Sequence, residues 1–202
     1  MKESIENLEL SETIFEKGIG LEKEFCEYLK TDLGWEKARV RSQMASKFNM
    51  RGTNVDVIAE RLDDRGRKLK LISKFYFAIC ILSLLIGLYL INDDSGLTIF
   101  LFGVFVFIVG FVSFNLGEKL NKENAWVECK NLKTKVNISQ VQKTIDEYKH
   151  YKDSGNDEYK FVKCYFVSTN GFIENALKLA IDNDIICYKK ENGIFKKIEY
   201  WD

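Results

Sequence analysis

Two long uncharged apolar runs limit what this chain can fold into more than any other feature. They are Phe75–Ile91 and Leu97–Leu116, and neither contains Asp, Glu, Lys, Arg or His. As helices they would be roughly 26 and 30 Å long, and the hydrocarbon core of a bilayer is about 30 Å thick. One ionised side chain at mid-bilayer costs about 3 kcal/mol, so the lack of charge is informative. We expect two membrane-spanning helices; the alternative is a buried helical hairpin in a soluble protein, but such helices usually keep a polar face.

The connection between the runs decides their topology. Residues 92–96 are too few to cross back, so the helices form an antiparallel hairpin with both ends on one side. The tip carries Asp93 and Asp94. Basic residues flank the opposite end: Arg65, Arg67, Lys68, Lys70, Lys74, Lys119 and Lys122. Basic flanks mark the cytoplasmic face. We therefore expect a protein of the cell (inner) membrane with two spans, and both termini in the cytoplasm.

The rest of the chain has the size of one domain, roughly 150 residues. We divide the sequence into a polar N-terminal segment (1–18), a first domain part (19–70), the hairpin (71–118) and a second domain part (119–202). The N-terminal segment lacks an apolar core, so no cleavable signal peptide is expected. Lys plus Arg equals Asp plus Glu, at 30 each, so no overall basic charge announces a nucleic-acid partner. The odd number of cysteines, 5, favours reduced thiols that fill the core.

Hydrophobic spacing predicts an α/β fold, with a sheet flanked by helices and interrupted by the hairpin. The expected helices are Gly20–Leu33, Ile138–Tyr151 and Phe172–Asn183. The expected strands are Val40–Gln43, Asn54–Leu62, Ala125–Lys130, Phe161–Ser168, Ile185–Tyr188 and Ile194–Tyr200, with a hairpin turn at Asn192-Gly193.

Two of these strands carry charged residues in unusual places. Alternation along Ala125–Lys130 puts Glu128 and Lys130 on one face of the sheet. If Asn54–Leu62 is the antiparallel neighbour of this strand, Asp56 lies about 5 Å away across the ladder. Two carboxylates and a lysine suit Mg²⁺, a cation that prefers oxygen ligands and activates water. The alternative is a plain cross-strand salt bridge on a solvated face.

Five stretches in order resemble the Mrr-type branch of the PD-(D/E)xK restriction-endonuclease-like nucleases. They are Gly20–Leu29, Asn54–Glu60, Trp126–Lys130, Val136–Gln142 and Phe166–Ala180, and they cover nearly all of the soluble part. The resemblance implies a restriction-endonuclease-like fold with a mixed central sheet, a DNA substrate and Mg²⁺ as cofactor, with Mn²⁺ as a substitute. It leaves the hairpin unexplained.

The resemblance also assigns roles to single residues. It makes Asp56 and Glu128 metal ligands together with the backbone carbonyl of Cys129, and it makes Lys130 the catalytic lysine. Gln142, with Gln140 as the alternative, matches a polar residue of the following helix that assists the site. Glu24, with Glu22 and Glu27 as alternatives, matches an acid of the first helix. These helix residues could equally be solvated surface. The proline of the family name is absent before Asp56, whereas Glu128 stands where many relatives carry glutamine.

Several other polar residues have two interpretations. Thr169, Asn170 and Gly171 could bind a phosphate at a helix start, or simply form a strand-to-helix turn, which we favour. Three lysines beyond the Glu128 strand could meet a phosphate backbone but are more typical of solvated surface: Lys133, Lys135 and Lys143. His150 is expected on a helix surface, and Ser11 and Ser139 are candidate helix caps.

The sequence thus predicts a membrane-anchored, metal-dependent endonuclease that hydrolyses DNA phosphodiester bonds, in restriction, defence or DNA processing. A second hypothesis is a catalytically inactive module of the same fold that binds nucleic acid or a partner. A third is a membrane element that works through its hairpin, although the spans lack the charges of an ion path. Gly103 and Gly110 allow close helix packing, including packing between protomers of a homo-oligomer.

Overall fold

The computed structural model describes residues 19–46, 49–90, 94–120, 122–153 and 159–199, so the candidate cap Ser11 lies outside the described residues. The chain separates into two compact units. The first combines Met1–Arg61 with Glu123–Asp202, and the second is Leu62–Lys122. The inserted segment is therefore a unit of its own.

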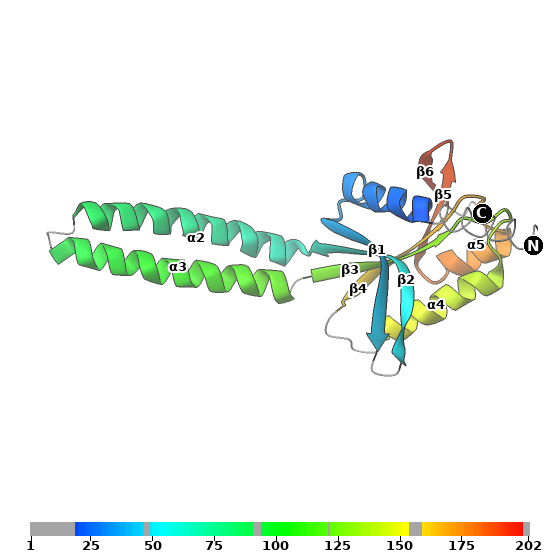
Figure 1. The fold of residues 1–202 in the computed structure, drawn as a ribbon, viewed down its shortest axis with the longest axis horizontal. Coiled ribbons are helices and arrows are strands. Elements are labelled where there is room, and N and C mark those ends of the chain that lie inside the picture. Colours follow the sequence, from blue (N-terminus) through cyan, green and yellow to red (C-terminus); the bar gives the residue numbers. More distant parts are fainter. Residues whose placement is uncertain (1–18, 47–48, 91–93, 121, 154–158, 200–202) are drawn as a thin grey trace, which may run out of the picture. The chain divides into compact units, whose positions relative to one another are not determined.

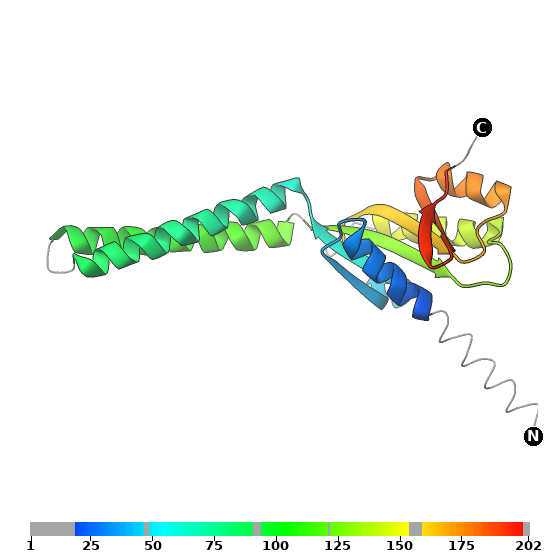
Figure 2. The ribbon, with the colours of Figure 1, turned by 90° about the horizontal axis from the view of Figure 1, so that it is seen from above.

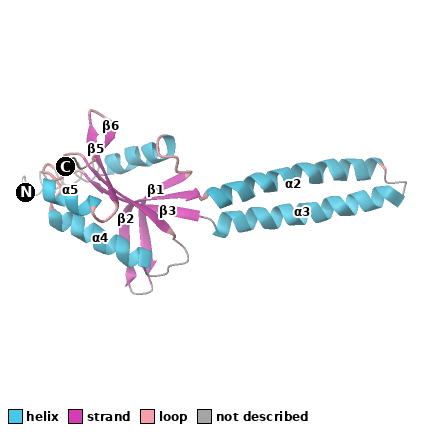
Figure 3. Ribbon diagram, turned by 180° about the vertical axis from the view of Figure 1, so that it is seen from behind, coloured by secondary structure: helices cyan, strands magenta, loops and turns pink. Residues whose placement is uncertain are grey.

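The first unit is built on a mixed sheet of six strands in the order β1-β2-β3-β4-β5-β6 (Figures 1 and 3). These strands are β1 (Lys37–Ser46), β2 (Asn49–Leu62), β3 (Lys122–Lys130), β4 (Phe161–Ser168), β5 (Ile185–Glu191) and β6 (Ile194–Lys197). β1 and β2 are antiparallel, β3, β4 and β5 are parallel, and β6 returns antiparallel to β5. The predicted α/β class with a mixed sheet is confirmed.

Helices cover both faces of this sheet. The first helix, over residues 19–31, lies on one face, and α4 (Ile138–Asp153) and α5 (Glu174–Ile181) lie on the other (Figure 2). Alternating residues of β3 supply both cores, because Trp126 packs with α4 and α5 while Val127 packs with the first helix. Both side chains are fully buried. The sheet is thus the middle layer of three.

Turn chemistry explains where several elements end. Asn192 and Gly193 have positive φ angles of 49° and 81°, as a tight turn between β5 and β6 requires. Asn137 begins α4 with a capping box: its Oδ1 accepts from the N–H of Gln140 at 3.1 Å, and Gln140 Oε1 accepts from the N–H of Asn137 at 3.0 Å. The cap of this helix is therefore Asn137, not Ser139, whose hydroxyl donates to Asn137.

The second unit is an antiparallel pair of long helices, α2 (Asp64–Tyr89) and α3 (Asp94–Leu120). Both contain a stretch long and apolar enough to cross a membrane, over Asp64–Tyr89 and Ser95–Gly117. α2 begins well before the predicted span, because Asp63 caps it by accepting from the N–H of Gly66 at 2.7 Å. The basic residues that precede the apolar run are therefore helical.

Small residues form the seam between these two helices. A Cβ added to Gly87 would lie 2.9 Å from the backbone nitrogen of Phe100, and one added to Gly103 would lie 2.7 Å from the hydroxyl of Ser83. The large apolar side chains point outward instead, and Phe105 and Leu82 are 63% and 60% exposed. A water-soluble hairpin would show the opposite arrangement, with large apolar residues inside and polar residues outside.

The cysteines behave as expected. All five thiols are unpaired and buried: Cys26, Cys80, Cys129, Cys164 and Cys187. Burial raises the pKa of Cys26 to about 11 and that of Cys187 to about 12, so neither is a thiolate near neutral pH. The prediction that they fill the core is confirmed.

Candidate metal and catalytic site

Asp56, near the middle of β2, reaches across to the neighbouring strand β3. Its Oδ2 accepts a hydrogen bond of 2.8 Å from the backbone N–H of Cys129. Arg61, five residues further along β2, contacts Glu123, six residues before Cys129 on β3. The contact that lies further along β2 thus lies earlier along β3, so the two strands run antiparallel. This is the condition under which the sequence put Asp56 beside Glu128.

Lys130 joins the two carboxylates. Its Nζ donates a hydrogen bond to Glu128 Oε1 and lies 3.9 Å from Asp56 Oδ2. The three side chains are partly shielded, with 12% of Glu128, 24% of Asp56 and 30% of Lys130 exposed. The structure therefore brings together the three residues that the sequence singled out, on two adjacent strands separated by the inserted hairpin.

Burial and the neighbouring charges shift the pKa values of two residues in this cluster. Burial, followed by the negative charge of Asp56, raises the pKa of Glu128 to about 7. Burial acts to lower the pKa of Lys130, but the charge and hydrogen bond of Glu128 outweigh it and the pKa is raised. Lys130 therefore stays protonated near neutral pH. Perturbed groups that converge in this way are typical of functional sites.

The donor atoms fit a hard divalent cation. The cluster has two acids against one ammonium, and each carboxylate keeps one oxygen beyond those engaged by the Cys129 N–H and by Lys130. Among the described residues no group of three or more His, Cys, Asp or Glu side chains converges to hold a metal. A cation here would complete its shell with water, backbone oxygen or substrate phosphate, as Mg²⁺ commonly does. The Cys129 carbonyl stays a prediction.

Helix α4 carries an acid near Glu128 that the sequence pattern did not single out. Gln142 is exposed, and its Nε2 donates to Asp146 Oδ1 at 2.8 Å on the same helix, while Gln140 is half-buried in the capping box. Glu147 is half-buried, and its negative charge helps to raise the pKa of Glu128. Glu147 lies seven residues after Gln140 and so on the same face of the helix. Extending the spacing from Gln140 could have found it.

The first helix carries three candidate acids, and the structure buries only one of them. Glu24 is half-exposed and forms an ion pair with Lys190 of β5. Glu27 pairs with Lys30 at 2.6 Å, one helical turn along. Glu22 is 3% exposed and lies near the thiol of Cys129, whose pKa its charge helps to raise after burial and Asp56. Glu22 is therefore the buried acid of this helix, on the sheet face opposite Glu128.

The segment Thr169–Gly171 is a structural turn. The hydroxyl of Thr169 donates to Asn131 Oδ1 at 3.2 Å, and the side chain of Asn170 donates to the carbonyl of Leu132. Gly171 has a φ of 73°, which favours glycine. Its carbonyl accepts from the buried Ser168 hydroxyl at 3.1 Å. These bonds tie the turn to the loop after β3, in agreement with the favoured interpretation.

The remaining polar candidates lie on the surface. Lys133, Lys135 and Lys143 are exposed, and Lys143 lies 3.8 Å from Glu147. His150 is exposed on α4, as expected.

No protein-family model and no curated protein matches this chain. Among solved structures, the crystal structure of a protein of unknown function, AF1548, is similar with a TM-score of 0.45 and 13% sequence identity. The match covers 85% of this chain and 58% of that chain, so this chain spans less than two thirds of the length of AF1548.

Proposed function

We propose that this protein is a membrane-anchored, metal-dependent nuclease that hydrolyses phosphodiester bonds in DNA. The observation that carries the proposal is the convergence of Asp56, Glu128 and Lys130 from two strands that the sequence separates by the whole hairpin. An accidental surface salt bridge would not need a third charged group shielded beside it. The resemblance to the Mrr-type PD-(D/E)xK nucleases, and their restriction-endonuclease-like fold, fits the same three residues.

The proposal gives each charged side chain of the cluster a role in metal binding or catalysis. Asp56 and Glu128 would hold Mg²⁺, which when bound supplies Lewis-acid stabilisation of the phosphate and a more acidic water. The Cys129 N–H fixes the orientation of Asp56 by holding one of its oxygens. Lys130, kept protonated by Glu128, offers a positive charge to the phosphate oxygens as negative charge develops on them. The half-buried Glu147 adds negative potential beside Glu128.

We infer that the hairpin anchors this unit in the membrane. Its outward side chains are large and apolar along both helices, whereas its seam is made of glycine, serine and cysteine. Lipid tails solvate such apolar side chains favourably, whereas contact with water is unfavourable. Because basic flanks are typical of the cytoplasmic side, the basic first turns of α2 support a cytoplasmic location of the nuclease unit and both termini.

Plasmid nicking tests the enzymatic part of the proposal. Purified full-length protein in detergent is incubated with supercoiled DNA and Mg²⁺ or Mn²⁺, beside the Asp56→Asn variant prepared in the same way. We expect nicking that needs the metal and is lost in the variant. Metal-dependent DNA binding without nicking would instead favour the inactive binding module, and equal nicking by both proteins would reveal a contaminant. RNA as an additional substrate distinguishes the two nucleic acids.

Membrane extraction tests the anchor. The full chain should stay in the pellet after alkaline carbonate treatment, while a variant whose residues 64–120 are replaced by a short Gly-Ser link should be soluble. A fluorescent protein that folds only in the cytoplasm is fused to the C-terminus. Its fluorescence reports the side of the membrane on which the C-terminus lies. A dark but full-length fusion would contradict the cytoplasmic placement.

A further inference from the structure

A second charged cluster lies in the first unit where the two site-bearing strands meet the hairpin sequence. The Nε and a terminal nitrogen of Arg61, near the end of β2, contact Glu123 Oε2 at 3.0 and 2.9 Å. Glu123 is the second residue of β3. Both side chains are largely shielded, with 22% and 18% exposed. The pair therefore closes the end of the β2–β3 ladder.

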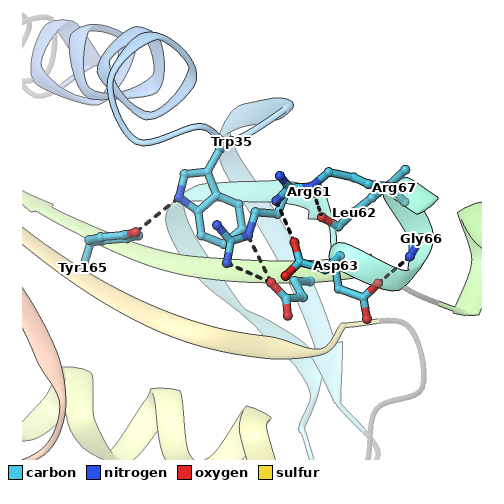
Figure 4. A network of polar contacts seen from close by, with 9 residues as sticks. Trp35, Arg61, Leu62, Asp63, Gly66, Arg67 and Tyr165 are labelled. Atoms are coloured by element: carbon cyan, nitrogen blue, oxygen red, sulfur yellow. Dashed lines mark hydrogen bonds and ion pairs between the residues drawn. The ribbon is translucent and has the colours of Figure 1, made fainter. Parts of the chain in front are cut away.

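Two aromatic residues hold this pair in place. The guanidinium of Arg61 lies 4.7 Å from the ring centre of Trp35, a residue that is only 2% exposed. The indole N–H of Trp35 donates to the hydroxyl of Tyr165, on β4, at 3.2 Å (Figure 4). An arginine that both stacks and pairs has its planar group fixed in two directions. We name these four residues, Trp35, Arg61, Glu123 and Tyr165, the strand clamp.

The clamp lies on the opposite face of the sheet from the candidate site. Arg61 follows Val57 and Ala59, which pack with the first helix, and Glu123 precedes Ala125 and Val127 on that same face. Glu128 follows Trp126, which packs with α4 and α5. The clamp cannot touch the site directly. Any influence on it must pass through the backbone register of β2 against β3.

That register is what the site depends on. Asp56 lies five residues before Arg61 on β2, and Glu128 lies five residues after Glu123 on β3. The hairpin sequence begins directly after Arg61 and ends directly before Glu123, so no tight turn fixes the pairing of these strands. In an ordinary β-hairpin the tight turn sets the register of the two strands. A slip by one residue then moves every side chain of a strand to the other face of the sheet. Here a side-chain clamp takes the place of the turn.

We propose that Arg61 and Glu123 are positioning residues: they hold β2 and β3 in register at the base of the inserted hairpin and thereby keep Asp56 against the Cys129 N–H. The inference that this matters for cleavage rests on the proposed function. The inference about register does not, because the Cys129 amide is a probe that needs no activity. Protection of that amide reports the bond to Asp56.

Hydrogen exchange of the full chain in detergent, resolved at the Cys129 amide by fragmentation mass spectrometry, tests the register. In Arg61→Gln and in Glu123→Gln we expect exchange at this amide to be about tenfold faster, because separating β2 from β3 locally costs less free energy without the ion pair. Arg39→Gln is the matched control, since it removes an ion pair with Glu60 at the same end of β2 but on the β1 side. In this control variant the rate of hydrogen exchange at the Cys129 amide should equal that of wild type.

Two further readouts separate positioning from general destabilisation. The reversed pair, Arg61→Glu with Glu123→Arg, should restore much of the protection that each single change removes. Mn²⁺ affinity should weaken about tenfold in Arg61→Gln while the melting temperature of the Arg39→Gln control and its Mn²⁺ affinity stay near wild type. If wild type itself binds no Mn²⁺, the proposed function fails and the exchange result still judges the clamp. Folded Arg61→Gln and Glu123→Gln proteins with wild-type protection at Cys129 would overturn the inference.

Discussion

Asp56 Oδ2 lies 2.8 Å from the backbone nitrogen of Cys129, so a side chain of β2 is hydrogen-bonded to the main chain of β3 between Glu128 and Lys130. This bond takes one of the two oxygens of Asp56 and fixes the direction of the other. It also puts Asp56 within 3.9 Å of the Lys130 ammonium. Asp56 is thereby held in one orientation, which would lower the entropy cost of binding the proposed cation.

Lys130→Met should abolish cleavage while metal binding persists. In the proposed mechanism the variant loses the positive charge that stabilises negative charge developing on the phosphate, and removing one such group costs about 10²–10³ in rate. Nicking rates under saturating Mn²⁺ measure the loss, and calorimetry measures the metal affinity. Lys133→Met, an exposed lysine three residues on, is the control and should cleave like wild type. Undiminished cleavage by Lys130→Met would remove Lys130 from the mechanism.

Asp56→Asn should weaken Mn²⁺ binding strongly, because it removes a charged ligand and leaves an amide whose oxygen can still accept from the Cys129 N–H. The expected loss is at least about 100-fold, or roughly 3 kcal/mol. Asp146→Asn, which changes an exposed acid of α4, should bind Mn²⁺ like wild type. Similar affinities for the two variants would show that Asp56 is not a ligand.

Metal affinity should rise with pH up to about neutrality. The pKa of Glu128 is raised to about 7, so below pH 7 a proton must leave before this carboxylate can bind a cation. Apparent Mn²⁺ affinity should therefore increase by up to about tenfold per pH unit between pH 5 and 7 and level off above. Glu128→Gln has no such proton to lose and should give a flatter, weaker profile. Parallel profiles for both proteins would assign the titration to another group.

Gly103→Leu should loosen the helical hairpin. A Cβ at this position would meet the Ser83 hydroxyl at 2.7 Å and the Leu84 side chain at 3.2 Å, so a leucine here must displace packed side chains of α2. The cost is about 1–3 kcal/mol, seen as a lower melting temperature of the helical signal in detergent. Phe105→Leu, on the exposed outside of α3, is the control and should change little. Equal melting temperatures would show that the seam is not tightly packed.

Local periodicity predicted much of this structure, because strands and helices repeat their burial every second or every third to fourth residue. The alternation in β3 placed Glu128 and Lys130 together, and two uncharged runs indicated two long helices. The same periodicity would have favoured Glu22 over Glu24, since Glu22 shares the buried stripe of Phe25 and Leu29. Glu24 was preferred to Glu22 because of the family resemblance and not because of the hydrophobic spacing.

Pairings across the inserted hairpin lie beyond such patterns. Nothing periodic connects Arg61 with Glu123, because their contact depends on the register of two strands that are remote in sequence. The start of α2 was also missed. The apolar run begins at Phe75, but the helix begins at Asp64, where a capping aspartate and not hydrophobicity sets the boundary.

Anomalous diffraction from crystals of the full chain grown with Mn²⁺ tests whether Asp56 and Glu128 hold a divalent cation beside Lys130. We predict an anomalous peak about 2.2 Å from a carboxylate oxygen of both acids. A fully occupied Mn²⁺ elsewhere, with Glu128 still bonded to Lys130 and no density between the two acids, would contradict it.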